Sequence, residues 1–308
     1  MPPARPVTIA FGGDVHFEGA SRSALGGLGP ISDVLSQADL AVVNLESAVT
    51  SGGSPSAKEY NFRAPPSAFA ALKSSGVDVA TMANNHGMDY GVSGLRDSLR
   101  HARAADFPVI GIGADESRAY APYRTTIDGQ RIAVIGATQV IDTAFINTWT
   151  AGPDKPGLAS AKDEDRLLEA VRAARRDSDT VVVYLHWGAE RVSCPTDAQR
   201  QLAPKLLAAG ADIVVGGHAH VRLGSGWLGQ GYVNYGLGNF VFYARPGEGA
   251  QTGVLLLTVR GRAVTKAEWR PAEIRGGRPV PLTGDAAARS LASWRALRGC
   301  AGLNDRAG

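Results

Sequence analysis

The sequence predicts an α/β fold with a largely parallel sheet, and three observations support this prediction. Short apolar runs alternate along the chain with amphipathic segments of helical period. The runs at 180–185 and 213–215 are continuous, which is typical of strands buried on both faces. Polar residues follow several of these runs rather than preceding them. Because sites in open α/β sheets form outside the carboxyl ends of the strands, we expect the functional site there.

The composition is that of an ordinary globular protein and excludes several classes of function. The chain has 308 residues, of which 44% are apolar and 20% charged. A net charge of +3 gives no basic footprint for a nucleic-acid partner. No run approaches the roughly 18 apolar residues of a membrane span, and no signal core precedes the first strand. We therefore expect no membrane contact and a cytoplasmic location.

The domain organisation and the cysteines leave some questions open. No repeat and no clear linker divides the sequence, so we predict a single domain over residues 1–308. Cys194 and Cys300 are the two cysteines, and their number is equally consistent with a disulfide and with a reducing compartment. The oligomeric state does not follow from the sequence.

Polar residues follow the first two predicted strands. The strand at 7–11 leads to Asp14 and His16, which share an i, i+2 spacing. The strand at 39–43 ends shortly before Glu46. A carboxylate beyond a buried strand costs desolvation energy unless it is paired or bound to a cation. Asp14 is therefore a turn cap or a ligand, and Glu46 is a salt-bridge partner or a ligand.

The third predicted strand, 77–82, ends in a segment dense in polar groups. Asn85 offers a neutral amide oxygen, and His86 offers a ring that titrates near neutral pH. Asp89 either orients His86 through a hydrogen bond or caps the helix predicted at 92–104, and the two roles are compatible.

Capping residues and periodic apolar positions predict the helices, which we place at 31–38, 67–75, 92–104, 163–176, 196–209 and 286–298. A hairpin is expected at 123–127 and 131–135, around an Asp-Gly turn. The runs at 231–235 and 251–259 are expected to be antiparallel strands. The segment 142–156 either overhangs the site or is a surface excursion.

Two histidines stand one residue apart after the strand at 213–215. In an extended strand, residues i and i+2 point the same way, so His218 and His220 can reach one small volume. The preceding glycine pair allows a sharp turn and a close approach of the backbone. Alone, such a pair is equally compatible with a surface loop.

The strand at 180–185 delivers His186 to the same edge, and Glu190 follows it. We expect Glu190 and Arg63 to bind substrate, with Arg63 as an anchor for an anionic group. A surface arginine is the alternative for Arg63.

Together the strand ends offer more ligands than the three or four that one catalytic zinc ion needs. The predicted metal ligands are Asp14, His16, Glu46, Asn85, His186, His218 and His220. Imidazole, carboxylate and amide groups suit divalent cations such as Zn, Mn or Fe. A pair of ions roughly 3.5–4 Å apart would use them, with Glu46 as the bridging carboxylate. We therefore predict two divalent metal ions.

The same residues resemble a known family. Gly-Asp-x-His at Asp14, Asn-Leu-Glu at Glu46, Asn-Asn-His at His86, His-Trp-Gly at His186 and Gly-His-x-His at His218 are similar to motifs of one family. This family is the CapA-type, poly-γ-glutamate-synthesis branch of the calcineurin-like metallophosphoesterases. The segment 235–240 also resembles that branch. The resemblance spans nearly the whole chain and implies a four-layer α/β/β/α sandwich with metals between the loops of two sheets.

The resemblance also implies a role for each site residue. One metal would take Asp14, His16, Glu46 and His220, and the other would take Glu46, Asn85, His186 and His218. His86 would lie beside the metals as a proton-transfer residue. Asn-Leu-Glu at Glu46 replaces the bridging Asp of the wider superfamily, as is usual in the CapA branch.

Three functions follow from this resemblance. The main expectation is Cα epimerisation of a peptide substrate, because some soluble CapA-like proteins resemble epimerases of ribosomal (lasso) peptide maturation. There a metal would polarise the carbonyl beside Cα and stabilise an enolate. A base such as His86, oriented by Asp89, would remove the Cα proton, and another group would return a proton to the opposite face. The alternative is a dinuclear metallohydrolase of phosphoesters or γ-glutamyl amides. A non-catalytic assembly protein is the third, although structural zinc sites are usually closed and rich in cysteine.

Overall fold

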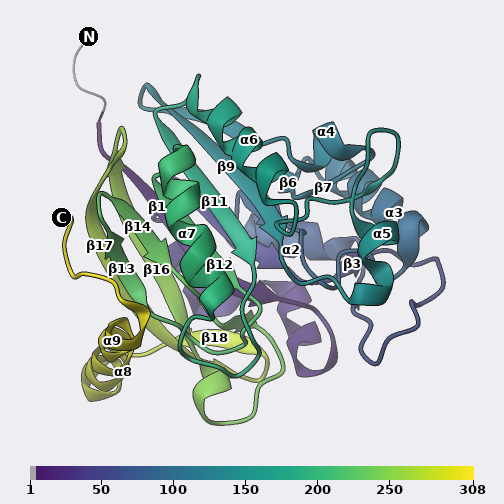
Figure 1. Ribbon diagram of the computed structural model, residues 1–308. Helices are drawn as coiled ribbons and strands as arrows, with labels where there is room; N and C mark the ends of the chain where they lie inside the picture. The colour runs from purple at the N-terminus through teal and green to yellow at the C-terminus, as the bar shows by residue number, and fades with distance from the viewer. Residues whose placement is uncertain (1–4) are drawn as a thin grey trace.

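Two β-sheets lie face to face between two layers of helices, as Figure 1 shows. The coordinates are a computed structural model that describes residues 5–308, so the first four residues of the predicted domain, 1–308, lie outside the described part. Helices α6 (Glu164–Arg175) and α7 (Asp197–Ala209) cover one sheet, and α2 (Ser67–Ser74) covers the other. The α/β class and the four-layer α/β/β/α sandwich are thereby confirmed.

The first sheet is mixed, with a parallel half and an antiparallel half. Its strands, in spatial order, are β18 (Arg278–Pro281), β17 (Ala263–Arg275), β16 (Gln251–Arg260), β1 (Val7–Val15), β2 (Leu40–Leu45), β5 (Val79–Thr81) and β6 (Val109–Ile110), with β15 (Asn239–Val241) also paired to β1. Strands β1, β2, β5 and β6 are parallel. Strands β16, β17 and β18 extend the sheet in antiparallel fashion.

The second sheet has a parallel centre and antiparallel edges. Its strands, in spatial order, are β13 (Ser225–Leu228), β14 (Gly231–Asn234), β12 (Ile213–Gly217), β11 (Thr180–His186), β9 (Gln130–Thr138) and β8 (Tyr123–Ile127). The predicted hairpin is confirmed as the antiparallel pair of β8 and β9. Two short two-stranded sheets complete the set, β3 (Ala48–Val49) with β4 (Arg63–Ala64) and β7 (Ile112–Gly113) with β10 (Gly157–Leu158).

The two runs predicted as antiparallel strands each have an antiparallel neighbour, β13 for β14 and β1 and β17 for β16, but they do not pair with each other. The runs at 231–235 and 251–259 form β14 and β16, but these strands lie in different sheets. Strand β14 pairs in parallel with β12, whereas β16 pairs with β1. The reason lies in burial, because Tyr232 packs between the sheets while Val233 packs under the outer helices. A strand buried on both faces belongs at the interior of a parallel sheet.

The apolar layer between the sheets is built by alternation along each strand. In β1, Val7, Ile9 and Phe11 face the second sheet, while Ala10 faces the helices of the first. In β11, Val182 and Tyr184 face inward in the same way. Side chains at successive strand positions point to opposite faces, so each strand contributes to two cores.

The helices follow the predicted segments with small shifts. The further helices are α1 (Ser32–Leu35), α3 (Gly91–Ala104), α4 (Glu116–Ala119), α5 (Ile146–Trp149), α8 (Gly284–Ala296) and α9 (Arg298–Ala301). The segment predicted as a helix at 31–38 has only the single turn α1, preceded by a 3-10 turn at Gly29–Ile31. Thr196 caps α7 through a capping box with Gln199, as the sequence indicated.

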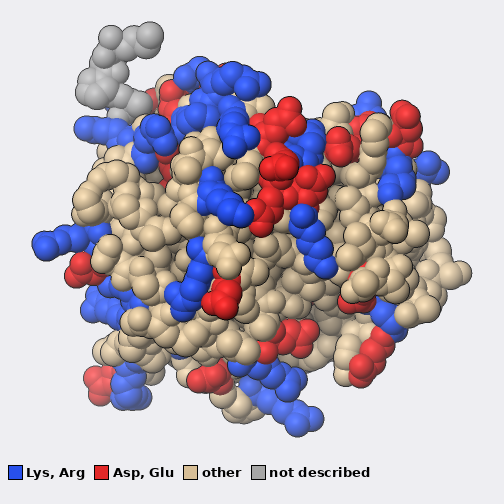
Figure 2. All heavy atoms as spheres, in the orientation of Figure 1, with Lys and Arg blue, Asp and Glu red and all other residues tan. Residues whose placement is uncertain are grey.

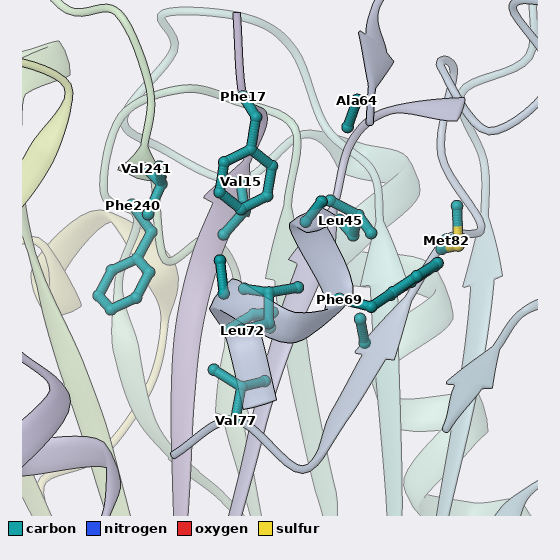
Figure 3. Close-up of a cluster of buried hydrophobic side chains, with 14 of the residues drawn as sticks. Val15, Phe17, Leu45, Ala64, Phe69, Leu72, Val77, Met82, Phe240 and Val241 are labelled. Carbon is teal, nitrogen blue, oxygen red and sulfur yellow. The ribbon is translucent and has the colours of Figure 1, made fainter. Parts of the chain in front are cut away.

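The outer helices are held by apolar side chains of helical period. In Figure 3, Phe69 and Leu72 of α2 lie against Val15 and Leu45, at the carboxyl ends of β1 and β2. All four side chains are fully buried. The hydrophobic layer therefore extends up to the edge where the polar strand ends begin.

The surface carries charges of both signs. Figure 2 shows acidic and basic side chains interspersed across one face, with large uncharged areas between them. Within residues 5–308, no helix combines the length and the hydropathy that crossing a bilayer requires.

Cys194 and Cys300 form a disulfide, the alternative that the sequence left open. The bond joins the loop after β11 to the C-terminal helix α9. Disulfides persist mainly in oxidising compartments, so this bond weighs against the cytoplasmic location expected from the sequence.

Reduction of this disulfide is expected to lower the free energy of unfolding by about 2–4 kcal/mol, since the bond closes a long loop of the unfolded chain. Its two cysteines are 106 residues apart. Urea unfolding with and without reductant measures the effect. A Cys194→Ser, Cys300→Ser protein should have the unfolding midpoint of the reduced wild type, and reductant should not change it. An unchanged midpoint on reduction would contradict the prediction.

Candidate metal centre

Side chains from both sheets meet between the loops that follow the parallel strands. Ligand atoms of Glu46, His218 and His220 lie within 4.8 Å of one another, and so do those of Asp14, Glu46 and His186. Glu46 belongs to both groups, in the bridging position that the family resemblance implies. The first sheet supplies Asp14 and Glu46, and the second supplies the three histidines.

Asp14 joins the two sheets through its carboxylate. One oxygen accepts a hydrogen bond from Asn44 Nδ2 (2.8 Å) on the neighbouring strand. The other accepts from the backbone N–H of His218 (3.0 Å) and lies 3.5 Å from His220 Nδ1. Burial on its own would raise the pKa of Asp14, but the bond from His220 and the nearby His186 lower it to about 2. The group is therefore a charged, well-bonded carboxylate.

Glu46 has the opposite character. Its side chain is fully buried, and neither carboxylate oxygen has a hydrogen-bond partner. Burial, together with the charge of Asp14, raises its pKa to about 8. A buried carboxylate without a donor is costly unless a cation compensates it. His218 Nδ1 and His16 Nε2 are likewise buried and unpartnered. These orphaned acceptors, next to a bonded carboxylate, fit one or more divalent cations.

The histidines of the centre are mostly neutral. Burial lowers the pKa of His186 to about 3 and that of His218 well below its ordinary value. Burial also opposes the charge on His220, yet Glu46 and Asp14 raise its pKa to about 9. Neutral imidazoles are the form that binds metals, and a cation here would take the place of the proton on His220.

The backbone at the paired histidines differs from the extended geometry expected from the sequence. Strand β12 ends at Gly217, and both His218 (φ 90°) and His220 (φ 56°) have left-handed backbones. Their ring centroids are 6.0 Å apart, and the ring of His186 is 4.8 Å from that of His218. The rings thus converge through a strained turn and not through strand alternation. Strained backbones of this kind cluster at functional sites.

Gly217 makes the close approach of the sheets possible. A Cβ built on this residue would lie 2.3 Å from Asp14 Oδ1, inside contact distance. Gly217, the second of the two glycines before the histidines, therefore lets the carboxylate reach the His218 N–H, the close backbone approach that the sequence predicts.

His16 lies beside the centre but in neither ligand group. Its Nδ1 accepts from the backbone N–H of Glu18 (3.1 Å) and lies 3.0 Å from Ser21 Oγ. Its ring is enclosed by Phe62, Phe242 and Tyr243, with centroids 4.8, 3.9 and 4.5 Å away. A metal-ligand role for His16 stays a prediction that rests on its free Nε2.

Asn85 contacts the centre through its amide oxygen. Its Oδ1 lies 2.7 Å from His186 Nε2, and that nitrogen is 3.5 Å from Glu46 Oε1. The amide oxygen thus lies next to two predicted ligands of the same metal, and its own ligand role stays a prediction.

His86 and Asp89 form a buried pair at the edge of the centre. His86 Nδ1 is 2.5 Å from Asp89 Oδ2, and its Nε2 is 3.9 Å from Glu46 Oε1. Because a carboxylate only accepts, Nδ1 carries the proton and Nε2 faces the metal ligands. Asp89 does not cap α3, whose N-cap is Tyr90. Of the two roles considered for Asp89, the structure supports orientation of His86.

Lys58 completes this pair, and sequence reasoning did not single it out. Its Nζ is 2.7 Å from Asp89 Oδ1 and bonds to the backbone oxygen of Asn85. Burial raises the pKa of Asp89 to about 7 despite this cation. The ring of Trp149, from the segment 142–156, lies 5.3 Å from Lys58 Nζ, so that segment does border the site.

Three asparagines around the ligands were also not singled out. Asn44 Nδ2 lies 3.1 Å from His186 Nδ1 in addition to its bond with Asp14. Asn84 donates to Asn44 Oδ1 (2.9 Å), and Asn239 Oδ1 lies 2.9 Å from His220 Nδ1. All three stand inside the motifs that carry the resemblance, which is the signal that could have found them. Lys58 lies in a polar loop and gives no such signal.

The two predicted substrate-binding residues have different surroundings. Arg63 is exposed, and its guanidinium lies 4.5 Å from the ring of Tyr90, outside the ligand group. Glu190 is exposed on the loop after β11, close enough to raise the pKa of His220 slightly. Glu190 therefore lies near His220, whereas Arg63 stacks on Tyr90 outside the ligand group.

Comparison with known proteins gives a consistent family match. The family described as "Bacterial capsule synthesis protein PGA_cap" matches residues 8–244. The "Capsule biosynthesis protein CapA" of Bacillus anthracis is 31% identical over 230 residues, covering 73% of this chain and 55% of that protein. The "PGA biosynthesis protein CapA" of Bacillus subtilis is 31% identical over 230 residues, covering 74% and 59%. The chain therefore spans a little over half the length of these relatives.

Solved structures share the fold at low sequence identity. A hypothetical protein from Thermus thermophilus superposes with a TM-score of 0.57 and 19% identity, over 87% of this chain and 100% of that one. A structure described as a novel phosphatase from Mycoplasma pneumoniae gives a TM-score of 0.55 and 17% identity, over 88% and 94%.

We predict that Glu46→Gln leaves stability nearly unchanged without metal and removes most of the stabilisation that metal gives. Without metal, the amide replaces an unpartnered carboxyl, so the free energy of unfolding should stay within about 1 kcal/mol of the wild type. With metal at a hundred times its Kd, the wild type gains about 2.7 kcal/mol, and the variant should lose most of this gain. Thermal unfolding in chelator and in Zn²⁺ or Mn²⁺ measures both. Equal destabilisation in the two conditions would contradict a ligand role for Glu46.

Replacement of Asn239 tests whether its hydrogen bond to His220 orients this predicted metal ligand. Asn239→Ala is expected to weaken metal affinity about 10–100-fold, because the partner that orients His220 is lost. His218→Ala should remove bound metal outright, and His101→Ala on α3 is the matched control. Metal content by mass spectrometry and competition titration give the affinities. Full metal content in His218→Ala would count against the ligand set.

Proposed function

The chain belongs to the bacterial capsule synthesis (PGA_cap) family, and from this premise we propose that it is a divalent-metal-dependent hydrolase. Its candidate bond is a γ-glutamyl amide, with a phosphoester as the other member of the same reaction class. The family match and the names of the relatives support this hydrolytic reading better than the peptide epimerisation expected from the sequence.

One observation carries the proposal. A carboxylate without a protein partner, Glu46, is shared by two groups of ligand atoms, and a proton-carrying pair lies beside it. Asp14, Glu46, His186, His218 and His220 would hold the cations, with Asn85 and His16 as further candidates. When bound, such ions polarise the scissile oxygen and supply a nucleophile from water at neutral pH.

The residues of the chain itself account for proton transfer. Asp89 holds the Nδ1 proton of His86, so that Nε2 points towards Glu46 and the reacting group. Lys58 holds Asp89 from the other side, and Phe62 stacks on the imidazole with centroids 3.9 Å apart. Burial lowers the pKa of His86 to about 3, so the ring is neutral in the resting protein. It can therefore receive a proton at Nε2 and return it to the leaving amine or alkoxide.

The aromatic side chains limit access to one side of the centre. Phe62, Phe242 and Tyr243 surround His16, and Phe62 also covers one face of His86. His220 is the most exposed of the predicted histidine ligands, at 19% of its side chain, although Phe242 packs against its ring. A substrate therefore reaches the centre beside His220 and the exposed ring of Tyr243, at the outer edge of this aromatic wall. Exclusion of water by the aromatic wall strengthens the electrostatic interactions inside.

The test is incubation of metal-loaded protein with γ-linked glutamate oligomers and with phenyl phosphate esters in deuterium oxide. Hydrolysis is expected to give shorter oligomers with new amino groups, or to release phosphate. A one-dalton gain without cleavage would instead indicate Cα exchange and would overturn the hydrolase proposal. Mass spectrometry distinguishes the outcomes.

His86→Asn is expected to lower kcat about 10²–10⁴-fold, because proton transfer to the leaving group is lost. Its metal content should equal that of the wild type, since His86 is outside the ligand groups. A variant with full metal and unchanged kcat would remove His86 from the mechanism.

A further inference from the structure

The large apolar side chains that are exposed within residues 5–308 lie on loops around the metal centre. We call the surface that they form the mouth of the centre. They are Tyr60, Val192 and Tyr243, with 59%, 45% and 44% of their surface exposed. Tyr60 precedes Phe62, which stacks on His86, and the ring of Tyr243 lies 4.5 Å from that of His16. Val192 stands on the loop that follows His186. Exposed apolar groups on three separate loops around one site indicate a binding surface.

Arg191 is built into the same mouth by its backbone. Its N–H donates to the carbonyl oxygen of Ala219 (2.7 Å), the residue between His218 and His220. Its φ is 60°, so it shares the left-handed conformation of those two histidines. Few non-glycine residues adopt this conformation, and a structure that maintains it beside a site does so at an energetic cost. The hydrogen bond therefore holds Arg191 in register with the ligand turn.

The charge of Arg191 is not used within the described part of the protein. No carboxylate of residues 5–308 lies within ion-pair distance of its guanidinium, and the residue is exposed. The Tyr60 phenol lies near enough to Arg191 and Glu190 to sense their charges: its pKa is raised, most strongly by Glu59, and the charge of Arg191 opposes this rise. Because Glu59 and Glu190 lie on the same surface as Arg191, this surface carries charges of both signs. Recognition of an anion here depends on one placed cation and not on a broad positive field.

Resting on the hydrolase function proposed above, we infer that Arg191 is the anion-recognition residue of the substrate site. Its guanidinium binds a carboxylate or phosphate of the substrate, while Tyr60, Val192 and Tyr243 pack on the carbon chain that bears it. Guanidinium groups match both anions through paired hydrogen bonds. Tyrosine rings supply apolar area together with a hydroxyl that can bond to an amide. A chain that alternates methylene groups with carboxylates presents both features.

This assignment replaces Arg63 as the expected anion anchor. Arg63 is on the short strand β4, and its guanidinium stacks on Tyr90. Arg191, by contrast, is hydrogen-bonded to the turn that carries two of the ligand atoms. Position relative to the centre, and not the residue type, separates the two arginines.

The test is equilibrium binding to metal-loaded protein in a His86→Asn background, which slows turnover. The probes are a γ-linked glutamate oligomer, the same oligomer with amidated α-carboxylates, and phenyl phosphate. Arg191→Gln is expected to weaken binding of the anionic probe about 10–100-fold, and Arg191→Lys to recover part of the loss. Tyr60→Ala and Tyr243→Ala should each cost about two- to tenfold. Arg172→Gln, an exposed arginine on α6, is the control and should bind as the parent does.

The probe that loses affinity in Arg191→Gln identifies the anion as carboxylate or phosphate. The inference is overturned if the parent protein binds neither anion, or if Arg191→Gln binds both anionic probes as tightly as the parent. If the oligomer is the probe that depends on Arg191, equal binding of its amidated form also overturns the inference. Binding that depends on Arg191 without any hydrolysis by the His86-containing protein supports the anion site and refutes the hydrolase function. Unchanged metal content in every Arg191 variant separates this effect from loss of the centre.

Discussion

The carboxylate of Asp14 is the constraint on which the arrangement depends. It lies fully buried at the end of β1 and accepts hydrogen bonds from Asn44 on β2 and from the His218 N–H beyond β12. A displacement of either sheet would leave a buried charge without its donors, at a cost of several kcal/mol. One charged group therefore sets the separation of the sheets at the edge where the other ligands converge. Gly217 leaves the space that this contact needs.

Around this contact, some polar groups of the site have hydrogen-bond partners within the protein and others have none. The groups without partners are those available to a cation. Asp14 and His186 have protein partners, whereas both oxygens of Glu46 have none. Folding has thus buried acceptors that an added cation would satisfy. Asn44, Asn84 and Asn239 orient the groups that have partners, which is how surrounding residues tune metal ligands. Lys58, Asp89 and His86 form a second buried chain whose open end faces the same volume.

The loops serve different purposes on the two sides of the centre. On one side, aromatic rings enclose His16 and cover His86. On the other, the loop after β11 brings Glu190, Arg191 and Val192 to the mouth, and the disulfide at Cys194 ties that loop to the C-terminal helix α9. The PGA_cap match ends at residue 244, so this disulfide partner lies beyond the shared region. The residues of the centre all lie within the region that matches the family, whereas the C-terminal segment that helps to hold the mouth lies beyond it.

The sequence by itself determined the α/β class, the strands whose ends carry the ligands, and most of the helices, because these depend on local periodicity and capping. It also placed the ligand residues at one edge, because parallel strands end together. Only the tertiary structure decided which groups touch. The left-handed turn at His218 and His220, the partner of β14, the disulfide, and the choice of Arg191 over Arg63 all depend on contacts between distant segments. Lys58 illustrates the limit: its loop is polar and irregular, and its role arises from the space between Asp89 and Asn85, which no local pattern encodes.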